Sequence, residues 1–124
     1  MFQAYSELGF TLRKLGRYDE SLAAYEKALA LEPGFSPALE YRAEAYLGLG
    51  RLDDVKSTYM TLFDGDRPKA DVLMTSMNSW LAAQKTKPTV DAAQLDAFGK
   101  WVESRQTIAG QVPAVASADT FRSW

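Results

Sequence analysis

Two pairs of adjacent carboxylates, Asp19-Glu20 and Asp53-Asp54, are the residues of this sequence whose types and spacing could do chemistry. Neighbouring acids can work as a general acid and base, or bind a hard cation. Each pair, however, follows a glycine closely and stands where a helix would begin. Acids at that place interact favourably with the helix dipole and the free N–H groups of the first turn. We therefore interpret both pairs as helix-start residues.

The composition limits the other chemistry that this chain could do. Its 124 residues include no cysteine and no histidine, which excludes disulfides, thiolate nucleophiles and every histidine-based acid, base or ligand. Neither a glycine-rich phosphate loop nor a serine-centred nucleophile motif occurs in the sequence. The sequence predicts a protein that is not an enzyme and that uses no cofactor and no metal.

Charge and hydropathy narrow the classes of partner. The 14 basic residues are scattered among 16 acids, so no clustered basic face is available for nucleic acid. No apolar run approaches the ~20 residues that span a bilayer, and the first residues lack the order of a signal peptide. The hydrophobic fraction of 47% is that of a globular domain with its own core. The compartment stays open between cytoplasm and bacterial periplasm.

Apolar residues recur at helical spacing from the start of the chain. Two stripes, in residues 5 to 15 and 18 to 31, each advance by three or four residues, which is one face of a helix. Gly16 between them can adopt the left-handed conformation that ends a helix, so the pattern predicts an antiparallel hairpin. The stripes are Tyr5, Leu8, Leu12 and Leu15, then Tyr18, Leu22, Tyr25 and Leu29.

The same pattern returns 34 residues later. Leu15-Gly16-Arg17 recurs as Leu49-Gly50-Arg51, and Tyr25 recurs as Tyr59. This predicts a second hairpin over residues 36 to 63, with both tyrosines packed between helices. Residues 70 to 85 predict a further helix, and Thr89 or Asp91 can cap the one after it. That last pair is either a diverged third repeat or a capping hairpin.

These residues resemble the tetratricopeptide repeat, a 34-residue helix-turn-helix unit. The family pattern is matched at Tyr5, Leu8-Gly9, Leu12, Ser21, Tyr25, Ala28 and Pro33. The second copy departs from it at Arg42-Ala43 and at Leu62. The resemblance implies an all-α, right-handed superhelical stack of about six helices over residues 1–107. Its repeats would cover about 2–35, 36–69 and, in diverged form, 70–106. The resemblance does not extend to residues 108–124, whose lack of helical period predicts a non-helical tail.

The resemblance also implies a function. In this family the first helix of each hairpin lines a concave groove, which implies a non-enzymatic scaffold for protein–protein interaction with a protein or peptide partner. Glu40 and Glu44 stand where carboxylate-binding members have amide or basic groups, so a mixed, partly apolar segment suits the groove better. The matched groove positions are Ser6, Phe10, Arg13, Lys14, Glu40, Glu44, Leu47, Met74, Asn78 and Leu81. The alternative for any one of them is a solvated helix surface.

Two other functions remain open. The apolar end faces of a short array could be covered by a second copy, which would make the chain a self-assembling homo-oligomer. The chain could also be the repeat domain of a larger protein that carries its activity elsewhere. A ligand pocket could also form around Trp80, Trp101, Met74 and Met77. Their helical spacing favours instead a place in the core of the third hairpin.

The C-terminal residues break the helical pattern. Residues 108 to 124 have no sustained period, yet they carry Phe121 and Trp124 near the end of the sequence. We expect this tail to pack on a repeat surface, its own or that of a neighbouring copy, with these two aromatic residues as anchors. The alternative is a terminus without fixed structure.

Overall fold

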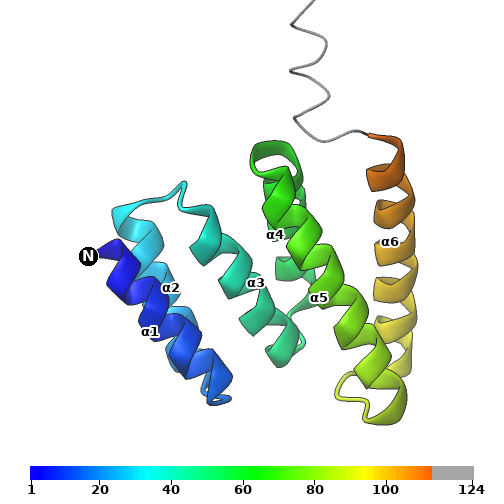
Figure 1. Ribbon diagram of the computed structural model, residues 1–124. Helices are drawn as coiled ribbons and strands as arrows, with labels where there is room; N and C mark the ends of the chain where they lie inside the picture. Colours follow the sequence, from blue (N-terminus) through cyan, green and yellow to red (C-terminus); the bar gives the residue numbers. More distant parts are fainter. Residues whose placement is uncertain (113–124) are drawn as a thin grey trace, which may run out of the picture. The chain divides into compact units, whose positions relative to one another are not determined.

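The computed structural model describes residues 1–112, and over this range the chain consists of six α-helices. Figure 1 shows them in chain order. The predicted all-α class of consecutive helical hairpins is therefore confirmed. The chain divides into two compact units, residues 1–73 and residues from 74 onward. The helices are α1 (Phe2–Lys14), α2 (Tyr18–Leu31), α3 (Ser36–Leu49), α4 (Leu52–Gly65), α5 (Arg67–Thr86) and α6 (Ala92–Gln111).

The first unit contains the hairpins α1–α2 and α3–α4, whose matching helices begin 34 residues apart. Both turns use a glycine with positive φ, +78° at Gly16 and +72° at Gly50. In each turn the residue after the glycine donates the hydrogen bond that ends the helix. The N–H of Arg17 donates to Leu12 O and the N–H of Arg51 donates to Tyr46 O, both at 2.9 Å. The predicted turns are confirmed, and they are alike in geometry.

Tyrosine rings fill the space between the helices of the first unit. Tyr25 and Tyr59 are both 0% exposed, as the sequence predicts. The Tyr25 ring lies directly over Gly9, where an added Cβ would come within 2.6 Å of the ring. On the same seam the Ser21 hydroxyl donates to Gly9 O at 2.8 Å. The absence of a side chain at Gly9 thus lets α1 and α2 approach each other closely.

The second unit contains the later part of α5 and all of α6, which run antiparallel (Figure 1). Phe98 and Val102 of α6 are buried, and the Trp80 ring meets Phe98 edge-on with a centroid distance of 5.6 Å. Trp101 stacks against the same phenylalanine at 6.0 Å. These half-buried tryptophans therefore pack against the buried Phe98 of the hairpin.

The ends of α6 settle one sequence prediction and correct another. Asp91 is the capping residue, because its Oδ1 accepts a hydrogen bond from the Gln94 N–H at 2.8 Å. The helix ends at Gln111, so residues 108–111, which the sequence places in a non-helical tail, are helical. The packed side of α6 continues from the buried Phe98 and Val102 to the half-buried Ala109, which explains the extra turn. Phe121 and Trp124 lie outside the described residues, so their role stays a prediction.

Candidate functional site

The sequence-predicted groove positions of α1 fall on one side of that helix. Phe10, Arg13 and Lys14 are separated by three and four residues, so their side chains share a face. In the first unit this face meets α3, which contributes Tyr41 and Glu44. We call these five residues the α1–α3 face.

Arg13 is the centre of the α1–α3 face. Its guanidinium carbon lies 5.1 Å from the centroid of the Phe10 ring and 5.8 Å from that of Tyr41. The two rings are 5.3 Å apart. A cation over an aromatic face is stabilised by about 0.5–1 kcal/mol where solvent reaches it, and by more where it is desolvated. The arrangement therefore holds Arg13 in place before any partner arrives.

An ion pair joins the two helices at the same point. Arg13 Nη1 lies 3.5 Å from Glu44 Oε1, and the two side chains are only 11% and 23% exposed. Lys14 is exposed and stands with its Nζ 5.4 Å from the Phe10 ring centroid. The face thus presents a partly covered arginine–glutamate pair beside an exposed lysine and an aromatic ring.

Glu40 lies one turn before Glu44 and behaves differently from it. Its side chain is 2% exposed, and its Oε2 has no hydrogen-bond partner among the described residues. Burial first and the neighbouring Glu44 second raise the pKa of Glu40, Arg13 and Lys69 lower it, and the net result is a pKa of about 8. Because this pKa exceeds 7, Glu40 holds a proton at neutral pH.

The structure separates the predicted groove residues into accessible and buried ones. Phe10 is 37% exposed, and Lys14 is exposed too. Four of the predicted positions are interior instead: Ser6, Glu40, Leu47 and Met74 are 4%, 2%, 4% and 8% exposed. The expectation that Glu40 is a surface charge is therefore corrected. Tyr41 is not among the residues predicted from the sequence, although its place three residues before Glu44 on the same helix could have suggested it.

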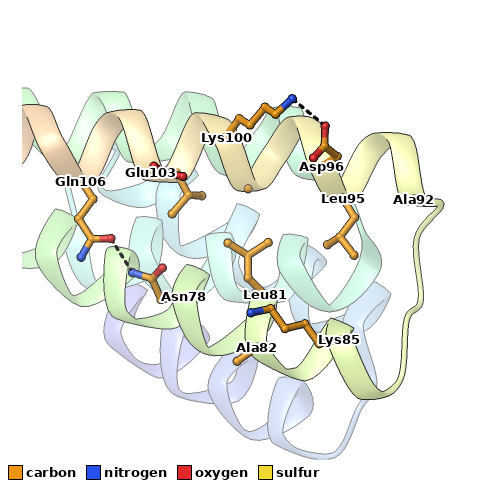
Figure 2. A pocket seen from close by; sticks show the side chains of 12 residues that line it. Asn78, Leu81, Ala82, Lys85, Ala92, Leu95, Asp96, Lys100, Glu103 and Gln106 are labelled. Atoms are coloured by element: carbon orange, nitrogen blue, oxygen red, sulfur yellow. Dashed lines mark hydrogen bonds and ion pairs between the residues drawn. The ribbon is translucent and has the colours of Figure 1, made fainter.

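The remaining predicted positions, Asn78 and Leu81, belong to the second unit. There they line an open groove of about 730 Å³ between α5 and α6, shown in Figure 2. We call it the α5–α6 groove. Its lining residues advance by three and four positions along each helix, but most of them are polar or small, so no apolar stripe in the sequence predicts the groove. The other lining residues are Ala82, Lys85, Ala92, Leu95, Asp96, Gly99, Lys100, Val102, Glu103 and Gln106.

Two other kinds of site are absent from the part of the chain that the structure describes. Among residues 1–112 no group of three or more acids could hold a metal ion. In that same range no helix combines the length and the apolar character needed to cross a membrane.

Comparison with known proteins identifies the first hairpin. Residues 2–35 match the family model of the tetratricopeptide repeat, which covers α1, α2 and the whole loop that leads to α3. Comparisons with curated proteins and with solved structures gave no match. Repeats of this family generally mediate protein–protein interaction and are typically non-enzymatic scaffolds. The α1–α2 hairpin is therefore similar to one tetratricopeptide repeat, and the match does not extend beyond residue 35.

Proposed function

We propose that this protein is a non-enzymatic interaction scaffold that binds an extended segment of a protein partner on the α1–α3 face. The observation that carries the proposal is Arg13, which contacts two aromatic rings and pairs with Glu44 on a face whose Phe10 and Lys14 stay accessible. Side chains that are fixed in advance lose little conformational entropy when a ligand arrives. Less of the free energy of the contacts with a partner is therefore lost to the ordering of these side chains.

The chemistry of the face defines the partner segment. The accessible edge of Phe10 suits an apolar side chain, and aromatic residues often dominate the energy of such contacts. Lys14 suits an acidic group beside it, and the partly exposed Glu44 suits a donor. We therefore infer a segment that alternates apolar and charged residues. The hairpin α3–α4, with the same turn geometry as α1–α2, would be the second repeat over residues 36–69.

The first prediction tests the face by removing its accessible ring. Peptides selected from a displayed random library on the immobilised protein should bind Phe10→Ala about tenfold more weakly, which corresponds to about 1.4 kcal/mol. Titration calorimetry with one selected peptide gives the dissociation constants. Met60→Ala is the matched control, because Met60 of α4 is 36% exposed against 37% for Phe10.

Two results would contradict this function. The first is a library selection that yields no binding peptide. The second is an equal loss of affinity in Phe10→Ala and Met60→Ala, which would show that the α1–α3 face is not where the peptide binds.

Self-assembly is a second candidate, favoured by exposed apolar residues along α1. Met1, Leu8 and Leu15 are 81%, 50% and 66% exposed and are spaced by seven residues, with Leu8 inside α1 and the other two at its ends. A second copy could cover these residues.

The second prediction follows from that stripe. If copies assemble through it, the mass in solution should rise above 13.8 kDa with concentration, and the double variant Leu8→Gln/Leu15→Gln should return it to that value. Light scattering over a range of concentrations provides the measurement. A constant monomer mass for the unchanged protein would exclude this candidate.

A further inference from the structure

The α5–α6 groove has an apolar floor and no side chain at its middle. Leu81 and Leu95 project between the two helices in Figure 2, and Val102 lies beside them in the lining. At Gly99 an added Cβ would meet only Leu81 Cδ2, at the ordinary contact distance of 3.9 Å. A volume of about 730 Å³ is in the range of pockets that take a ligand with large apolar groups.

The two ends of the groove differ. At one end the amide of Asn78 donates to Gln106 Oε1 at 3.3 Å, and at the other end Lys85 stands near the start of α6 (Figure 2). The rim of α6 carries the ion pair of Lys100 and Asp96, with a separation of 3.1 Å, and the exposed Glu103. An occupant must therefore combine apolar anchors with charges that can lie along this rim.

We propose that residues 113–124 of the same chain dock in the α5–α6 groove, with Phe121 and Trp124 as anchors. This inference does not depend on the function of the α1–α3 face. The segment contains two large aromatic residues for the apolar floor. Arg122 between them can face Glu103 of the rim, and Asp119 can face Lys85 or Lys100. The segment thus matches the groove in both apolar and charged groups.

The length of the segment allows this docking. The helix ends at Gln111, and the α6 residues that line the groove run back from Gln106 to Ala92. At 1.5 Å per helical residue they lie about 8 to 29 Å from the helix end along its axis. An extended chain covers about 3.3 Å per residue, so Phe121 can reach about 33 Å and Trp124 about 43 Å from Gln111. Both anchors can reach the groove even after the chain reverses direction.

Covalent attachment also favours this occupant over one drawn from solution. A short linker gives a tethered segment an effective concentration in the millimolar range. A second copy or an unrelated partner at micromolar concentration would have to bind far more tightly to displace it.

The test uses the full chain, whose lack of cysteine allows pairs to be introduced without background. One variant combines Ser123→Cys with Glu103→Cys on the groove rim. Its matched control combines Ser123→Cys with Ser104→Cys, because Ser104 is the next residue of α6, is exposed and does not line the groove. We expect the intrachain disulfide to form about tenfold faster in the first variant, since docking raises the effective concentration there.

A second change blocks the groove. Gly99→Leu places a side chain in it, whereas Gly110→Leu, at a position with nothing within 4 Å of an added Cβ, leaves it open. Both replace a helical glycine with a better helix former, so circular dichroism should show that the helices persist. Gly99→Leu should reduce the fast crosslinking rate to that of the Ser104 control, and Gly110→Leu should not.

Three outcomes would overturn the proposal. One is an equal crosslinking rate for the Glu103 and Ser104 positions, which would mean that the segment does not favour the groove. Another is an unchanged rate in Gly99→Leu. The third is a crosslinked product with twice the monomer mass, which would make a second copy the source of the occupant.

Discussion

Replacing Tyr25 with alanine should lower the free energy of unfolding by about 3–5 kcal/mol, as for other large buried aromatic residues. Tyr25 is 0% exposed, its ring covers Gly9, and it lies 6.3 Å from the Tyr41 ring, centroid to centroid. Removing the ring leaves a cavity on the α1–α2 seam. Because Ser21 hydrogen bonds to Gly9 on that seam, the two helices cannot easily close the cavity. Urea denaturation followed by circular dichroism measures the change.

Tyr25→Phe is the control for this prediction. The Tyr25 hydroxyl is buried and makes no hydrogen bond within the described residues, so its removal should change stability little. If Tyr25→Ala costs less than about 1 kcal/mol, or if Tyr25→Phe costs as much as Tyr25→Ala, then the ring does not hold the first repeat together as argued.

The second large effect is a fall in stability as the pH rises from about 4.5 to about 8. The folded state holds a proton on Glu40 with a pKa of about 8, whereas an unperturbed glutamate loses it near 4.5. Between these values the unfolded chain binds fewer protons, so each pH unit favours unfolding by about 1.4 kcal/mol. Below the lower value the contribution of Glu40 to stability is fully present, and above the higher one no further change is expected. The charged groups that act on Glu40 are Glu44, Arg13 and Lys69.

Glu40→Gln should remove most of this pH dependence, because an amide of similar shape stays neutral throughout. It should also make the protein more stable than the unchanged chain near pH 8. At that pH the unchanged chain loses free energy of folding, because its buried Glu40 either ionises or stays protonated well above the pKa of a free glutamate. Glu26→Gln, at an exposed position of α2, is the control and should retain the slope. Urea midpoints at several pH values between 5 and 8 give the result. Equal slopes for the unchanged chain and for Glu40→Gln would refute the assignment.

The sequence predicts the hairpins well because their determinants are local. Gly16 and Gly50 each sit at a turn that needs a positive φ, and the spacing of Tyr25 and Tyr59 marks the buried side of a helix. The cap of α6 is local too, since Asp91 bonds to a residue three positions later. Such features depend on neighbours in the chain, which the sequence displays directly.

The candidate site was predicted only in part because burial depends on distant contacts. Helix α3 packs against α1, α2 and α4, and its buried residues therefore occupy more than one side of the helix. Helical spacing alone assumes one buried side, and on that assumption Glu40 is read as a surface charge. The α5–α6 groove depends likewise on how Gly99 of one helix faces Leu81 of another.

The contact between the two hairpins of the first unit repeats the contact within the first hairpin. Tyr18 of α2 lies over Gly48 of α3, where an added Cβ would come within 2.5 Å of the ring, much as Tyr25 lies over Gly9. An aromatic ring that contacts a glycine of the facing helix leaves no room for water between the two helices. In repeat proteins the coupling between neighbours decides whether units unfold singly or together. Backbone amides of α2 and α3 should accordingly share one opening reaction in hydrogen exchange, and the two hairpins would melt as a single cooperative block.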